Sequence, residues 1–115
     1  MIACGLVACA LALDQPDPVT LSCTGSFDFS VELDLSRGRL LRAPAAEVES
    51  FELRDAGDAV FFFRDRVTAG RRAFEWISIS RVSGRYAHFV AFRDAASGTL
   101  EPATLVTAAG CELAT

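Results

Sequence analysis

The chain has no lysine, no asparagine and a single histidine. All eleven cationic side chains are therefore arginines, which a GC-rich genome explains without any functional role, and the lack of asparagine excludes N-glycosylation. With His88 as its one imidazole, the chain has few groups suited to general acid–base chemistry. The phosphate-loop, dinucleotide-binding, nucleophile-elbow and zinc-protease motifs are also absent. We therefore expect that the protein is not an enzyme and that it has no catalytic residue, metal or cofactor.

Hydrophobic side chains are plentiful. They make up 51% of the 115 residues and include nine phenylalanines, which is enough for one packed domain and too much for a disordered chain. Fifteen acidic residues against eleven arginines give a net charge of −4. This acidic balance argues against a nucleic-acid partner.

An uncharged apolar segment occupies residues 2–13, IACGLVACALAL. It is too short to span a membrane, which takes roughly 20 residues, but it fits the core of a signal peptide. Ala10-Leu11-Ala12 matches the small residues that precede a cleavage site. We expect residues 1–12 to be a signal peptide, 13–18 a linker and 19–115 a single β domain. A buried first strand or helix is the other interpretation of this segment.

A lipoprotein is an alternative form of export. Leu6-Val7-Ala8-Cys9 matches the motif that precedes lipid attachment, with Cys9 as the lipidated residue. Membrane attachment is expected only in that case. Both forms predict a protein of the periplasm or cell envelope.

Four cysteines divide into two pairs. Cys4 and Cys9 fall in the predicted signal peptide, which leaves Cys23 and Cys111 near the two ends of the domain. Exported domains of this size commonly oxidise such a pair, so we predict a Cys23–Cys111 disulfide. Two reduced thiols in a core are the alternative, and the absence of a C-x-x-C pair disfavours zinc.

The pattern after Cys23 is that of β structure. Residues 27–35, FDFSVELDL, alternate apolar and polar side chains without a break, which predicts a strand with one buried face. Gly57, Gly70, Gly84 and Gly98 then recur at intervals of 13 or 14 residues, each interval holding one strand and a turn. This spacing predicts an antiparallel meander. Residues 44–54 fit a strand with a slip at Ser50 better than a helix.

A disulfide between the first and last strands requires these strands to lie adjacent or face to face. We therefore predict a small antiparallel meander barrel of seven to eight strands, with a two-sheet sandwich as the alternative. Closure would also remove exposed strand edges.

Four residues are candidates for a contact surface: Trp76, Arg85, Tyr86 and His88. Trp76 lies where the apolar alternation changes phase, so either Phe74 and Trp76 or the following isoleucines should face outward. His88 shares a strand face with Tyr86, as a ligand-binding group or as a half-buried residue at the barrel rim.

Charge is spread unevenly along the chain. A basic patch is expected from the arginines of the middle hairpins, which include Arg64, Arg66, Arg71 and Arg72. Such a patch suits an anionic surface, although charged flanks on long strands explain it equally well.

Two resemblances rest on short motifs. Leu21-Ser22-Cys23-Thr24-Gly25, Ser83-Gly84-Arg85-Tyr86 and the terminal Cys111 resemble the membrane-bound C-type lysozyme inhibitors, small barrels whose Ser-Gly-x-x-Tyr loop places its tyrosine one residue later. Residues 77–84, ISISRVSG, are similar to a hairpin of short uncharacterised exported β proteins of proteobacteria.

From these features we expect an exported, non-enzymatic β domain of the bacterial envelope that acts by binding. Its expected partner is an envelope protein or a glycan, and the chain should be a monomer. A lysozyme-type inhibitor and a carrier of a small apolar ligand are the alternatives.

Overall fold

The computed structural model describes residues 13 and 18–114, and these residues form eight strands. The strands are β1 Val19–Gly25, β2 Asp28–Asp34, β3 Arg39–Arg42, β4 Glu52–Asp55, β5 Ala59–Thr68, β6 Arg71–Ser80, β7 Arg85–Phe92 and β8 Thr104–Leu113. The signal peptide predicted for residues 1–12, with Cys9, and most of the predicted linker lie outside the described residues. Within the described part, no helix is long and apolar enough to cross a membrane.

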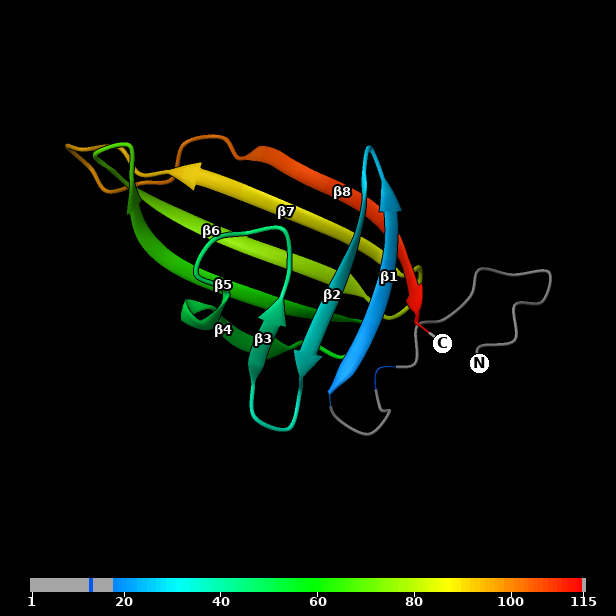
Figure 1. Cartoon of the computed structure of the whole chain (residues 1–115). Coiled ribbons are helices and arrows are strands. Elements are labelled where there is room, and N and C mark those ends of the chain that lie inside the picture. The colour runs from blue at the N-terminus through cyan, green and yellow to red at the C-terminus, as the bar shows by residue number, and fades with distance from the viewer. Residues whose placement is uncertain (1–12, 14–17, 115) are drawn as a thin grey trace.

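The eight strands form one sheet that curls into a nearly closed barrel (Figure 1). Their order is β3-β2-β1-β8-β7-β6-β5-β4, and each neighbouring pair is antiparallel. The two edge strands, β3 and β4, come together at a seam without a ladder between them. The prediction of a small antiparallel barrel is confirmed.

A disulfide joins the first strand to the last. Cys23 and Cys111 are direct partners in the β1–β8 register, and their sulfur atoms are bonded. The predicted pairing is confirmed. Because β1 and β8 lie side by side, the bond links the two ends of the domain across neighbouring strands.

The core follows the period-two alternation of each strand. In β2, Val31 and Leu33 are fully buried and Glu32 between them faces outward, as the sequence predicts, whereas Phe27 of the same predicted face lies before the strand and is 51% exposed. Val31 and Leu33 meet the inward side chains of β1, β5 and β6 in one cluster. Leu13 is 2% exposed and belongs to this cluster, so the first residue of the predicted linker is part of the core.

Residues 44–54 differ in part from the strand with a slip at Ser50 that is predicted for them. A single 3₁₀ turn, Val48–Ser50, stands at the place of the slip, and only residues 52–54 of the range belong to a strand, β4. The chain bends because Glu47 has a positive φ of 50° and its carbonyl accepts hydrogen bonds from Ser50 and from the guanidinium of Arg64. Phe51 is thereby buried.

Two tight turns depend on left-handed backbone. Between β5 and β6, Ala69 and Gly70 have φ values of 52° and 73°, the pattern of a two-residue type I′ turn. Between β6 and β7, Gly84 has a φ of 73°, and a Cβ there would lie 2.5 Å from the carbonyl oxygen of Cys111. The amide of Cys111 donates to the carbonyl of Gly84 at 2.8 Å, which holds this turn against β8.

Candidate functional site

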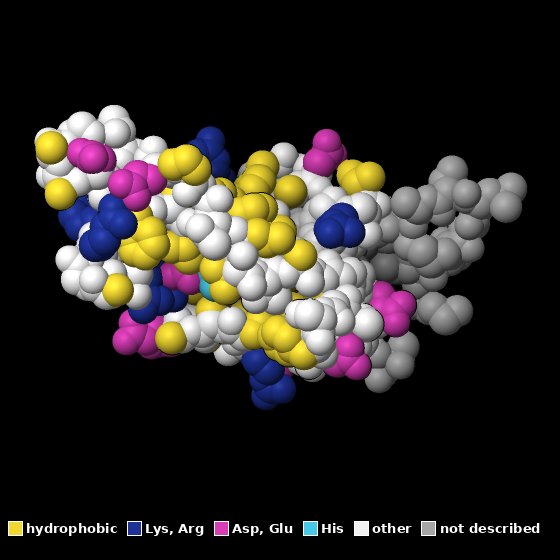
Figure 2. Space-filling model, turned by 90° about the horizontal axis from the view of Figure 1, so that it is seen from above, with side chains coloured by type: hydrophobic (Ala, Val, Ile, Leu, Met, Phe, Trp, Pro, Cys, Tyr) yellow, Lys and Arg dark blue, Asp and Glu magenta, His cyan; other side chains and the backbone are white. Residues whose placement is uncertain are grey.

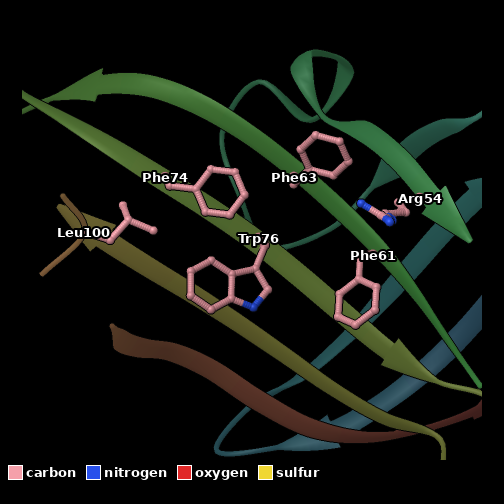
Figure 3. A pocket seen from close by; sticks show the side chains of 6 residues that line it. All are labelled: Arg54, Phe61, Phe63, Phe74, Trp76 and Leu100. Atoms are coloured by element: carbon pink, nitrogen blue, oxygen red, sulfur yellow. The ribbon is translucent and has the colours of Figure 1, made fainter. Parts of the chain in front are cut away.

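Aromatic side chains cover the outer face of β5 and β6. Phe61 and Phe63 of β5 point away from the barrel because Val60 and Phe62 fill its interior, and β6 places Phe74 and Trp76 on the same outer face. The rings surround a hollow of about 360 Å³. Its lining consists of Arg54, Phe61, Phe63, Phe74, Trp76 and Leu100. In Figure 3 the four rings lie between Leu100 at one end and Arg54 at the other.

The rings of this outer face contact one another in a chain. The centroid of Trp76 lies 5.1 Å from that of Phe89 on β7, with the planes nearly parallel, and 5.6 Å from that of Phe74. Strand register extends the row to Leu105 of β8, which is opposite Phe89 and 52% exposed. Figure 2 shows further hydrophobic side chains at the surface seen from above. The hollow is thus part of a broad, half-exposed apolar face.

The charges around the hollow are mainly positive. Arg54 is opposite Phe61 in the β4–β5 register, and Arg72 lies on the outer face of β6, two residues before Phe74. Among the described residues, neither arginine has a carboxylate within ion-pair distance. Asp65 at the same face is already paired with Arg93 at 3.1 Å. An anionic group in the hollow would therefore meet an unpaired guanidinium.

A second group of ionisable side chains lies inside the barrel. Glu75 of β6 accepts a hydrogen bond from Arg64 Nε of β5 at 2.8 Å and contacts His88 Nε2 of β7 at 2.5 Å. The half-buried Arg66 reaches the same carboxylate at 3.3 Å. Arg64, Glu75 and His88 are each no more than 4% exposed. Three neighbouring strands are thus tied by one buried ionic cluster.

This cluster fixes the charge of Glu75. Burial by itself would raise the pKa of its carboxyl, but the hydrogen bonds from His88 and Arg64 outweigh burial and lower the pKa from 4.5 to about 2. Burial, together with the negative charge of Glu75, raises the pKa of Tyr86. Glu75 is therefore ionised and Tyr86 neutral at any physiological pH.

The inner cluster contains a histidine–carboxylate pair, which is one part of many hydrolytic sites. The hydroxyl of Ser50 contacts Arg64 Nη1, and among the described residues no hydroxyl or thiol is hydrogen-bonded to the imidazole. Arg64 Nη2, Tyr86 Oη and His88 Nδ1 are buried without a hydrogen-bond partner among the described residues. The cluster links β5, β6 and β7 through the Glu75 carboxylate.

The four predicted contact residues do not share a surface. Trp76 is half-buried on the outer face and Arg85 is exposed at the start of β7. Tyr86 and His88 are 0% and 3% exposed, because their positions in β7 face the interior. They are therefore not contact residues on the outside.

The predicted basic patch is also wrong in part. Arg64 is buried against Glu75, and Arg66 is directed to the same carboxylate. Arg71 is paired with Glu101 at 2.9 Å, which leaves Arg72 as the exposed member without an acidic partner among the described residues. The alternation of β5 explains this result, since Arg64 and Arg66 occupy inward positions.

The sequence analysis did not identify Glu75 as the partner of His88, which lies 13 positions further along the chain on the next strand. The signal was nevertheless present: Glu75 shares its strand phase with Ala73, Ile77 and Ile79, all of which are buried. A carboxylate in an apolar phase must have a partner inside the core. Where the structure describes the chain, no three His, Cys, Asp or Glu side chains group as metal ligands would.

Comparisons with protein-family models, with curated proteins and with solved structures find no match for this chain. Its function is therefore inferred from the chemistry of the barrel.

Proposed function

We propose that this chain is an exported, non-enzymatic binding domain of the bacterial envelope, and that its ligand occupies the aromatic hollow on β5 and β6. The observation that carries the proposal is the hollow itself, which gathers Trp76 and three phenylalanines around about 360 Å³ of open space. This volume lies in the range of small-molecule sites. Large aromatic side chains supply much of the binding energy at such contacts.

Export is supported by two features of the chain. The Cys23–Cys111 bond suits an oxidising compartment, since disulfides of this kind persist outside the cytosol. The apolar segment at residues 2–13 suits a signal peptide. Both features fit a domain of the periplasm or envelope, in solution or held by a lipid on Cys9.

A binding role fits better than catalysis because the reactive groups are enclosed. Glu75 and His88 are buried and engaged with each other, whereas the outer hollow is lined by apolar rings and one arginine. A ligand in the hollow would meet surface for contact and no group placed for proton transfer.

An apolar ligand inside the barrel is disfavoured by packing. Leu21, Phe62 and Ile79 have no accessible area, which means that no water-sized space adjoins these side chains. The lysozyme-inhibitor alternative gains no support from the Ser83-Gly84 turn, because Tyr86 enters the barrel and does not project from that turn.

Titration with N-phenyl-1-naphthylamine, an uncharged aromatic probe, tests the proposal. We expect saturable binding with one site per chain, and binding about tenfold weaker in Phe74→Ala, because the variant removes one wall of the hollow. Phe27→Ala is the matched control, since Phe27 is 51% exposed and lies outside the hollow. Equal loss in both variants, or no saturable binding by the wild-type chain, would refute the proposal. Urea unfolding checks that both variants are folded.

A further inference from the structure

Arg54 is the polar member of the hollow's lining. Its strand, β4, forms one edge of the sheet, and Arg54 lies directly opposite Phe61. Side chains opposite each other in an antiparallel pair have Cβ atoms about 5 Å apart, so Arg54 and Phe61 start from neighbouring positions on the outer face. Figure 3 shows Arg54 and Phe61 together at one end of the hollow, with Leu100 at the far end.

The charge around the hollow opposes that of the whole chain. The chain carries −4, but the outer face beside the hollow has Arg54 and Arg72 without ion-pair partners among the described residues. On this face, Asp65 is paired with Arg93. Glu52, which is opposite Phe63, has no cationic partner among the described residues. Arg72 lies towards the Leu100 end, because its carbonyl accepts from the Arg93 amide and Arg93 pairs with Leu100, so it is the charge of Arg54 that favours an anionic ligand at the Arg54 end.

The lining of the hollow has a cationic end at Arg54 and an apolar end at Leu100. From Phe61 the lining continues over Trp76 and Phe74 to Leu100, with no charged side chain between. A ligand that fits this lining is therefore amphiphilic, with an anionic group at the Arg54 end. An apolar body laid on the rings and a carboxylate at Arg54 would satisfy both ends.

We infer, building on the proposed binding function, that the ligand of the hollow is a small amphiphile with an apolar body and one carboxylate, which Arg54 binds. A guanidinium offers two parallel N–H donors to a carboxylate, which fixes the direction in which the ligand lies. The apolar body replaces water on Trp76 and its neighbouring rings.

Calorimetric titration with 2-naphthaleneacetate and with 2-(2-naphthyl)ethanol tests the inference. The two probes share a ring system and differ in having a carboxylate or a hydroxyl. We expect the wild-type chain to bind the acid about tenfold more tightly than the alcohol, as suits a charge-assisted contact at a partly exposed site. In Arg54→Gln the two affinities should become equal, whereas Arg85→Gln, which removes an exposed arginine outside the hollow, should keep the preference.

Each result bears on the inference in a different way. Equal affinities in the wild-type chain overturn the carboxylate assignment and leave the binding function standing, whereas a lack of binding by both probes overturns the binding function as well. A preference that persists in Arg54→Gln shows that Arg54 is not the anion partner. Sedimentation with anionic phospholipid vesicles, in the absence of binding to either free probe, would assign the face to a lipid surface and overturn the inference.

Discussion

Replacing Glu75 by glutamine removes the carboxylate on which the inner cluster depends. The side chain is 5% exposed and has two arginines and a histidine within 3.3 Å. Glutamine preserves the size but not the charge, so Arg64 would remain buried without a counter-charge. Breaking a buried pair in this way costs about 3–5 kcal/mol. We expect the free energy of unfolding at pH 7 to fall by that amount.

The pKa of Glu75 gives an independent magnitude and a pH dependence. The fall from 4.5 to about 2 corresponds to about 3 kcal/mol, at about 1.4 kcal/mol for each tenfold change in proton affinity. Because the pKa is lower in the folded chain, this stabilisation is complete above pH 4.5 and is lost as the pH falls towards 2. The difference between the wild-type chain and Glu75→Gln should shrink over the same range.

Urea unfolding of the oxidised protein between pH 7 and pH 2 measures both effects. Glu101→Gln is the matched control, because it breaks an arginine–glutamate pair at 2.9 Å whose side chains are 46% and 41% exposed. Exposed pairs contribute at most about 1 kcal/mol, so this variant should stay close to wild type. A loss below about 1 kcal/mol in Glu75→Gln, or a difference that does not change with pH, would refute the reasoning.

Three further predictions concern the tight turns and the disulfide. Ala69→Asn should raise the free energy of unfolding by about 0.5–1 kcal/mol, because asparagine tolerates the positive φ of this turn better than alanine, and a lower urea midpoint would contradict it. Gly84→Ala should lower the free energy of unfolding by at least about 2 kcal/mol, because of the positive φ and the contact with Cys111. Gly57→Ala, which has a similar φ but open space around it, should lower it by about 1 kcal/mol. Equal urea midpoints for the two variants would exclude the contact as the cause. The Cys23–Cys111 bond closes a loop of 88 residues, so its reduction should lower the free energy of unfolding by roughly 4–5 kcal/mol through the entropy of the unfolded chain. An unchanged urea midpoint in the presence of reductant would contradict this.

The barrel and its disulfide could be predicted because they depend on a pattern that is local in the chain and on an even number of cysteines. Alternation over residues 27–35 defined the inner face of β2, and the even cysteine count paired the two ends. The chain around Glu47 could not be predicted in this way. Its bend depends on Arg64, a residue 17 positions away that reaches the Glu47 carbonyl across the seam.

The two candidate sites show the same contrast between features with local causes and features that depend on residues distant in the chain. Strand phase required either Phe74 and Trp76 or the following isoleucines to face outward without deciding between them, and the hollow arises from side chains of three separate segments, β4, β5–β6 and the loop with Leu100. Pairing in register brings these segments together, and a single sequence does not specify which strand neighbours which. His88 and Glu75 illustrate the same point inside the barrel, since strand pairing places them in contact.

The seam between β3 and β4 has a topological consequence. The spatial order of the strands is a cyclic rotation of their order in the chain, and the Ala114 amide donates to the Thr20 carbonyl at 3.0 Å, so the start of β1 and the end of β8 are neighbours. A circular permutant opened before Glu47, with the end of β8 joined to the start of β1 by a short linker, would run once around the barrel with every strand beside its predecessor. Its pairings would all be local in sequence, so it should fold faster than the natural chain, which must bring β1 to β8 across the full length of the domain.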